Sequence, residues 1–254
     1  MKLALLLIAA LIGGGVNALA GGGTFIVFPA LLFAGVSSVK ANATASLVFA
    51  PGSLVSAWVY RGTLKGQSPG RIAWLLVTSL GGSAAGSALL LNTSNRTFSN
   101  LVPWLLLIAA LFFTIAPRLR AAAARSAESA RASGAPATLL FVGQFIIAIY
   151  GGYFGAGMGV LMIALFLTAS DMGVQASNGV RLLCGAGINI LAIVLFAWRG
   201  ALDWKAGIPM LLAGVAGGYY GARIVRGLNE ETARKSILVY AWVLTTCFFV
   251  RPSL

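Results

Sequence analysis

The sequence predicts an all-α integral membrane protein with about eight hydrophobic segments in two four-segment repeats. Hydrophobic residues make up 59% of the 254 positions and charged residues only 9%, too little polar surface to cover a soluble fold of this size. Apolar stretches long enough to span a bilayer recur along the chain. Two of them, ALAGGGTFIVFPALL at 18–32 and YFGAGMGVLMIALFL at 153–167, are broken by glycines and lie about 135 positions apart.

Polar loops separate the hydrophobic segments, at about 61–71, 92–100, 118–136, 199–205 and 223–235. The longest interruption is RLRAAAARSAESARASGAP at 118–136, which contains four arginines and one acidic residue. We expect it to be a cytoplasmic basic linker, a solvated loop held near anionic lipid. It divides the chain into a first transmembrane repeat over 1–117 and a second over 137–254.

The first segment of each repeat is too long for one straight crossing. Residues 1–35 and 137–170 each comprise about 34 residues, or about 50 Å as a continuous helix. Each should therefore break at its glycines. One crossing plus a partial helix would make the repeats parallel, whereas entry and return on one side would make them inverted. Both arrangements place 11 basic residues on one side and 6 on the other, so charge bias leaves the choice open.

The two halves align over several motifs when the first is shifted by 135 positions. This shift sets AGGGTF at 20–25 against GAGMGV at 155–160 and KANA at 40–43 against QASN at 175–178. Three further residues in the second half then align WVYRGTL at 58–64 with LFAWRGAL at 195–202. The order and spacing indicate an internal duplication.

A glycine break inside a bilayer exposes backbone groups that lipid cannot satisfy, so it must face protein or a water-filled cavity. The N-terminus of a half-helix offers free N–H donors and partial positive charge, which transporters aim at anionic substrate groups. The donors predicted here are Gly22, Gly23, Thr24, Gly157, Met158 and Gly159. The alternative is that these glycines only allow close helix packing, the role predicted for Gly81, Gly82, Gly86, Gly214, Gly217, Gly218 and Gly221.

Polar residues form a stripe on the apolar segment that follows each break. In the first half, Asn42, Ser46 and Ser53 lie within about 40° of one another on one helical face. In the second half, the corresponding polar residues are Ser177, Asn178, Arg181 and Asn189. We expect both stripes to face the pseudo-symmetric centre and to contribute to substrate binding.

Arg181 is the most informative of these residues, because a guanidinium inside a spanning segment costs several kcal/mol unless it is hydrated or paired. A functional role is the default interpretation. The alternatives are reaching to a nearby interface and an ion pair with Asp171. Asp171 is also the only candidate for a proton-coupling carboxylate.

The residue types that are scarce exclude several classes of protein. The five acidic residues, Glu128, Asp171, Asp203, Glu230 and Glu231, all lie outside the deep parts of apolar segments, which argues against cation transport and carboxylate proton relays. Histidine is absent, which removes the usual ligand of haem, copper and catalytic zinc and the usual general base. We therefore expect no metal, no cofactor and no enzymatic activity.

The remaining inventory of N–H dipoles, amides, hydroxyls and one arginine suits a small oxyanion. The predicted function is a secondary anion transporter that works by alternating access, with a passive anion channel as the alternative. A membrane-embedded enzyme or assembly factor is a third, disfavoured class. Of the 18 Lys and Arg residues, 17 lie near segment ends, which indicates membrane topology rather than nucleic acid binding. The expected partners are the anionic substrate and the lipid bilayer, and homo-oligomerisation is left open.

The motifs resemble those of the sulfite exporter TauE/SafE family, described as probable membrane transporter proteins. The first copy is GGGTFIVFPALLFAG with KANATASLV, and the second is GAGMGVLMIALF with VQASNGVRLL and AWRGALDW. The resemblance implies a multi-pass protein of the bacterial cytoplasmic membrane that exports sulfite, sulfonates or related sulfur-containing or organic anions. The chain departs from the pattern where Pro29 is matched by Ala164 and where Ser46 is matched by Arg181.

Overall fold

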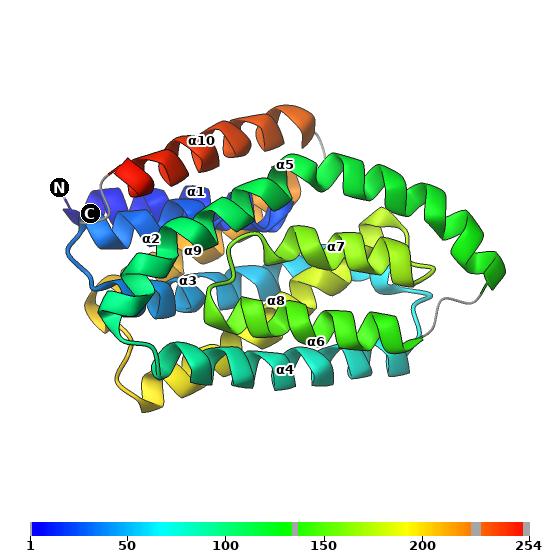
Figure 1. Cartoon of the computed structure of the whole chain (residues 1–254), viewed down its shortest axis with the longest axis horizontal. Helices are drawn as coiled ribbons and strands as arrows, with labels where there is room; N and C mark the ends of the chain where they lie inside the picture. The colour runs from blue at the N-terminus through cyan, green and yellow to red at the C-terminus, as the bar shows by residue number, and fades with distance from the viewer. Residues whose placement is uncertain (1, 134–136, 225–229, 251–254) are drawn as a thin grey trace.

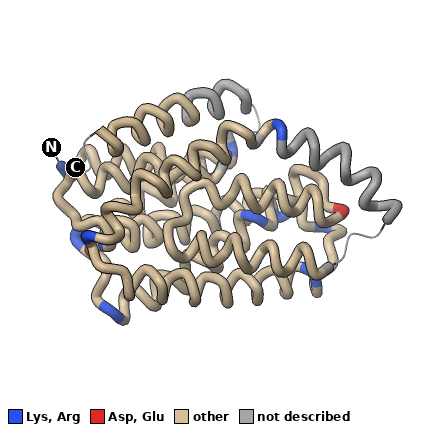
Figure 2. The backbone as a smooth tube through the Cα atoms, in the orientation of Figure 1, with Lys and Arg blue, Asp and Glu red and all other residues tan. Residues whose placement is uncertain are grey.

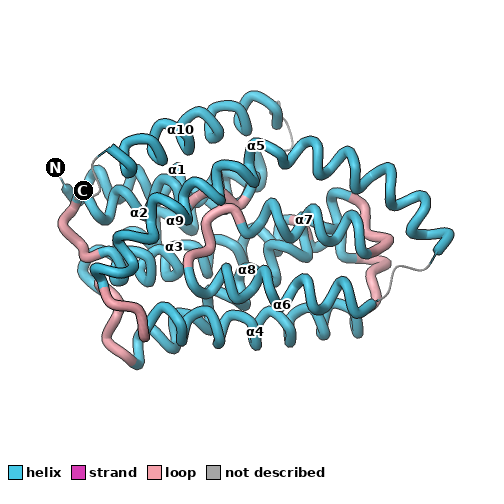
Figure 3. Tube along the Cα trace, in the orientation of Figure 1, coloured by secondary structure: helices cyan, strands magenta, loops and turns pink. Residues whose placement is uncertain are grey.

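The computed structural model describes residues 2–133, 137–224 and 230–250, and in these ranges the chain forms helices and no strand (Figure 3). The α-helices are α1 (Lys2–Ala20), α2 (Thr24–Phe33), α3 (Ser38–Val59), α4 (Pro69–Leu91), α5 (Asn95–Ser133), α6 (Ala137–Tyr153), α7 (Met158–Ala169), α8 (Val174–Trp198), α9 (Trp204–Ile224) and α10 (Glu230–Val250), and a 3-10 turn covers Arg61–Leu64. The predicted all-α class is confirmed.

Length and composition identify the membrane-crossing elements. Helices α4 and α8 and the Asn95–Ile115 part of α5 are long and apolar enough to span a bilayer, and shorter apolar helices accompany them. The described Lys and Arg residues lie mainly toward the two ends of the bundle (Figure 2). This arrangement keeps charge at the interfaces and makes the chain a multi-pass membrane protein.

The two long apolar stretches are each folded into a helical hairpin (Figure 1). In the first, α2 runs back along α1. Two contacts show this direction: the Lys2 Nζ donates a hydrogen bond to the Ala34 carbonyl at 3.3 Å, and Gly13 faces Val27. In the second, α7 runs back along α6, since Gly151 faces Met158 and Gly143 faces Leu165. Each stretch therefore enters and returns.

The returning helices are short. With 10 residues, α2 is about 15 Å long, and with 12 residues α7 is about 18 Å long. The hydrocarbon core of a bilayer is about 30 Å thick. Each returning helix therefore covers about half of that thickness, and the breaks before Thr24 and Met158 lie inside the bundle.

Helices α3 and α8 pack against each other at the centre of the molecule, and the outer helices cover them in matched pairs. Helix α1 packs on α9 as α6 packs on α4, and α3 packs on α9 as α8 packs on α4. Glycines allow this approach, because a Cβ added to Gly217 would lie 2.0 Å from the Leu11 oxygen and one added to Gly86 would lie 2.0 Å from the Ile149 oxygen. The packing role predicted for these two glycines is confirmed.

The predicted basic linker is largely helical, which corrects the expected loop. Helix α5 continues through Ser133, while 134–136 and the side chains of 119–133 lie outside the described residues. Alanine and arginine are among the strongest helix formers, so a polar composition did not imply an irregular backbone here. The division of the chain at this linker stays a prediction.

Candidate functional site

The two glycine breaks meet at the centre of the bundle. A Cβ added to Gly21 would lie 2.8 Å from the Gly159 Cα, and one added to Gly159 would lie 3.0 Å from the Gly21 Cα. Gly21 has a φ of +75°, a conformation that L side chains rarely adopt. Glycine at these two positions therefore lets the tips of the two hairpins touch.

Arg181 of α8 lies directly beside this contact and is only 3% exposed. Its Nε and Nη2 donate to Asn178 Oδ1 at 2.9 and 2.6 Å, which orients the guanidinium. Its Nη1 donates to the Asn17 carbonyl at 3.2 Å and its Nη2 to the Ala18 carbonyl at 2.9 Å. The positive charge thus caps the C-terminus of α1, where carbonyls lack helical partners. The guanidinium is therefore held by acceptors of the protein rather than by solvent.

Two small cavities lie in this region, each about the size of a single water molecule, and Arg181 lines one of them. The first, here called the amide cavity, has as its polar lining side chains Asn17, Thr24, Asn42, Ser46 and Asn189. The second, the arginine cavity, is lined by Gly21, Ser53, Gly159 and Arg181 and again by Asn17. Asn17 and Met158 line both, so the cavities are neighbours.

The amide groups around the cavities are held by the protein through their nitrogens. Asn42 Nδ2 donates to the Tyr153 carbonyl at 2.9 Å, which caps the C-terminus of α6. Asn189 Nδ2 donates to the Gly185 carbonyl at 2.9 Å, and Asn17 Nδ2 donates to Ser53 Oγ at 3.2 Å. Asn42 Oδ1 is buried and has no hydrogen-bond partner.

Six of the predicted substrate-binding residues line the cavities: Thr24, Asn42, Ser46, Met158, Gly159 and Arg181. The N–H of Met158 donates to the Gly155 carbonyl at 3.2 Å, so its contribution to the lining is its side chain. The N–H of Gly159 has no acceptor among the described residues. It is the donor most available to an anion beside Arg181.

The other predicted residues lie outside the cavity lining, at Gly22, Gly23, Gly157, Ser177 and Asn178. Gly23 packs on Gly13 and Gly157 packs toward Phe113, so these two glycines serve helix contact. Asn178 orients Arg181, and Ser177 has a buried hydroxyl without a partner. A direct role for these residues in substrate binding stays a prediction.

Sequence reasoning did not select Asn17 and Gly21, although both line the arginine cavity. Asn17 is the only amide in the first 41 residues and precedes the glycine triplet by one helical turn. That isolation in an apolar stretch was the available signal. The glycine motif was recognised, but its first member was not chosen, because no local pattern shows which glycine faces α8.

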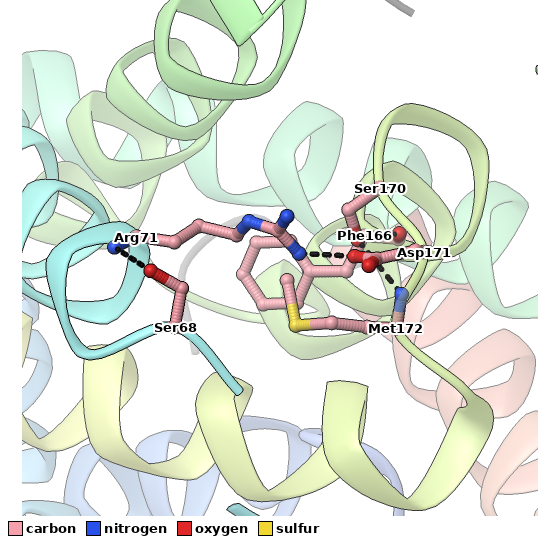
Figure 4. Close-up of polar contacts among 6 residues, drawn as sticks. All are labelled: Ser68, Arg71, Phe166, Ser170, Asp171 and Met172. Atoms are coloured by element: carbon pink, nitrogen blue, oxygen red, sulfur yellow. Dashed lines mark hydrogen bonds and ion pairs between the residues drawn. The ribbon is translucent and has the colours of Figure 1, made fainter. Parts of the chain in front are cut away.

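Asp171, the predicted coupling carboxylate, lies in the α7–α8 connection and lines neither cavity. Its carboxylate forms an ion pair with Arg71 at the start of α4, and its side chain is 61% exposed (Figure 4). In the part of the chain that the structure describes, no cluster of three or more His, Cys, Asp or Glu residues could hold a metal. The ion pair ties the α7–α8 connection to the start of α4.

Comparisons with known proteins give one consistent result. The family model described as sulfite exporter TauE/SafE matches residues 6–247. The chain is 28% identical to the "Probable membrane transporter protein ORF9" of Sinorhizobium sp over 99% of this chain and 94% of that protein. It is 27% identical to "Probable membrane transporter protein YfcA" of Escherichia coli K12, over 96% and 88% of the two chains. A Haemophilus influenzae "Probable membrane transporter protein" is 26% identical over 96% and 92%. No solved structure matches the chain.

Proposed function

The chain belongs to the sulfite exporter TauE/SafE family, and from this premise we propose that it is a secondary transporter of small anions in the bacterial cytoplasmic membrane. The substrate class is sulfite, sulfonates or related sulfur-containing or organic anions, moved outward. The observation that carries the proposal is the burial of Arg181 where the tips of both hairpins meet. A buried guanidinium within a spanning helix marks a substrate pathway.

The arginine cavity has the chemistry that an oxyanion requires. Arg181 supplies a planar, permanently charged donor group that matches two oxygens of a sulfite or sulfonate at once. The N-terminus of α7 lies beside it with the N–H of Gly159 available, and helix N-termini favour negative charge. Together these groups form an anion site without any described acidic side chain in its lining.

The helix arrangement supports two inverted repeats. Each half contributes five helices, from α1 to α5 and from α6 to α10, and each half starts with a hairpin whose second helix returns. Because each half has five helices that alternate in direction, the second half starts on the opposite side of the membrane from the first. The contact of α1 with α9 is mirrored by that of α6 with α4. Inverted repeats with a midplane site are the plan of many secondary transporters.

The hydrogen bonds that Arg181 makes in this closed arrangement link substrate binding to alternating access. Its guanidinium holds the carbonyls of Asn17 and Ala18, the last turn of α1. An oxyanion entering the arginine cavity competes for the same N–H groups and weakens the contact between α8 and the first hairpin. Substrate binding is thereby linked to the movement of one hairpin relative to the other half.

The test is uptake of radiolabelled sulfite into proteoliposomes that contain the purified chain, with unlabelled anions as competitors. We expect saturable uptake, acceleration by unlabelled sulfite preloaded inside, and loss of uptake in Arg181→Ala. Arg199→Ala is the matched control, because Arg199 is exposed at the end of α8. Uptake that is unaffected by preloading indicates a channel, and uptake retained in Arg181→Ala contradicts the site.

A further inference from the structure

Each of the three amides that line the amide cavity donates a hydrogen bond to the protein through its nitrogen, and no described donor contacts its oxygen. The nitrogen of Asn42 faces the Tyr153 carbonyl at 2.9 Å, which leaves Oδ1 buried and without a partner on a residue that is 4% exposed. The reverse orientation of this amide would set two oxygens against each other. The carbonyl of Tyr153 therefore fixes which end of the Asn42 amide is left for a ligand.

The other polar groups in the lining follow the same pattern. Asn189 uses its nitrogen on the Gly185 carbonyl and Asn17 uses its nitrogen on Ser53. Within the described part of the chain, neither Oδ1 accepts a hydrogen bond, and the hydroxyls of Thr24 and Ser46 make none. The residues that line the cavity thus leave three amide oxygens and two hydroxyl oxygens without a described protein donor.

The helix end beside the amide cavity carries partial negative charge, as the amide and hydroxyl oxygens do. Helix α6 ends at Tyr153, and Gly151, Phe154 and Gly155 from this end contribute to the lining. The C-terminus of a helix has partial negative charge and carbonyls without helical partners. Helix C-termini of this kind coordinate coupling cations in secondary transporters. The arginine cavity is the opposite case, with a guanidinium and the N-terminus of α7.

We propose that the amide cavity is a binding site for a small monovalent cation, with Na⁺ as the coupling ion, an assignment that rests on the transporter function proposed above. Divalent cations such as Ca²⁺ and Mg²⁺ rely on carboxylate ligands, and no described acidic side chain lines this cavity. Neutral oxygens suffice for one positive charge. At the level of the sequence, the scarcity of acidic residues argued against cation transport, but a cation held by neutral oxygens does not need a carboxylate ligand.

The positions of the two cavities couple the cation to the anion. Asn17 lines both, binds Ser53 through its side chain and accepts from Arg181 through its carbonyl. A cation in the amide cavity lies next to an anion in the arginine cavity, and opposite charges at short range inside a protein stabilise each other. Each ion therefore raises the affinity of the other, which is the thermodynamic basis of coupled transport.

The direct test is binding of ²²Na⁺ to the purified full chain in detergent, without any anion. The variants are Asn42→Ala and Asn189→Ala, each removing one amide oxygen. Asn189→Ala is the safer substitution for folding, because its nitrogen only bonds the preceding turn of its own helix. Asn92→Ala is the matched control, since Asn92 Nδ2 makes the same bond to the Ala88 carbonyl at 2.8 Å on an exposed residue.

We expect saturable Na⁺ binding that unlabelled Na⁺ displaces and choline does not. Loss of one ligand should weaken it about tenfold or more, in the range typical of metal-site substitutions, and Asn92→Ala should bind as the unaltered chain does. Absence of Na⁺ binding, or unaltered binding in Asn189→Ala, overturns the inference.

A second measurement separates this inference from the proposed function. Sulfite uptake into proteoliposomes is compared under an inward Na⁺ gradient and in choline. Equal uptake in both, without Na⁺ binding in detergent, removes the cation site and leaves the anion transporter intact. Na⁺ binding without movement of any anion under any gradient removes the transporter and leaves the cation site.

Discussion

The first helices of the two hairpins are capped at their C-termini by chemically different side chains. The C-terminus of α1 is capped by the guanidinium of Arg181 from α8, and the C-terminus of α6 is capped by the neutral amide of Asn42 from α3. In both cases the capping side chain comes from the central helix of the other half. The structure therefore has a charged cap at one helix end and a neutral cap at the equivalent end, and this difference underlies the opposite ligands that we propose for the two cavities.

Three lining residues of each cavity are related by a constant offset. Ala45, Ser46 and Phe49 of α3 line the amide cavity, and Arg181, Leu182 and Gly185 of α8, each 136 positions later, line the arginine cavity. The sequence alignment used 135 and matched Arg181 with Ser46. In the pattern of these lining residues, Arg181 instead corresponds to Ala45.

The largest expected effect is that of removing the charged cap. Arg181→Gln should lower sulfite counterflow about 100-fold, because hydrogen bonds to a charged group contribute about 1.5–3 kcal/mol each and the anion loses its counter-charge. Arg181→Lys should recover only part of this loss, since an ammonium keeps the charge but cannot form the forked contact. Counterflow in Arg181→Gln equal to that of the unaltered chain would show that the two caps do not differ in function.

Removing the neutral cap should have a smaller effect. Asn42→Ala leaves the Tyr153 carbonyl without its side-chain donor, which costs about 1–3 kcal/mol of stability and lowers the unfolding temperature by several degrees. The measurement is thermal unfolding of the purified chain in detergent, with Asn92→Ala as the control. A larger loss of counterflow in Asn42→Ala than in Arg181→Gln would reverse the comparison.

The contact between the hairpin tips can be tested by adding one methyl group. In Gly159→Ala the new Cβ would lie 2.7 Å from Arg181 Nη1 and 3.0 Å from the Gly21 Cα. We expect counterflow to fall about tenfold, in line with the 1–3 kcal/mol that overpacking costs. In Gly151→Ala the nearest atom, at 2.7 Å, is the Met158 sulfur of a flexible side chain. That variant should retain more activity, and the opposite order would mean that the tips are not closely packed.

The smallest effect is expected far from both caps. Asp171→Asn removes the ion pair with Arg71, whose side chains are 61% and 32% exposed, and such exposed pairs contribute about 0–1 kcal/mol. Stability and sulfite counterflow should stay close to those of the unaltered chain. A selective loss of uptake driven by a pH gradient would identify Asp171 as the coupling carboxylate after all.

Much of the architecture was predictable because it depends on local composition. Apolar segments of spanning length, glycine triplets at matching positions and a lone intramembrane arginine are all visible in the chain, and the structure has helices in each of the apolar segments. The direction of the returning helices was not predictable, because the same charges fit a parallel and an inverted arrangement. The contacts of Lys2 with Ala34 and of Gly151 with Met158 supply that direction.

The sequence predicted the types of residue at the site, but only some of the individual residues that line it. Helical periodicity placed Asn42, Ser46 and Arg181 on inward faces, and all three line a cavity. Which glycine of each break faces α8 depends on how the hairpin is rotated, and that rotation is set by packing against α9 and α4. Gly21 and Asn17 were missed for this reason.

By itself, the sequence determined that this chain is a helical membrane protein, because hydrophobicity and helical period act within a segment, and it predicted two similar halves. Only the tertiary structure decided which polar atoms are used and which are left for ligands. The Asn42 bond to Tyr153 joins residues 111 positions apart and the Arg181 bond to Ala18 joins residues 163 apart. Both pairings satisfy buried carbonyls at helix ends that lipid cannot satisfy, so they exist only once the two halves have packed together.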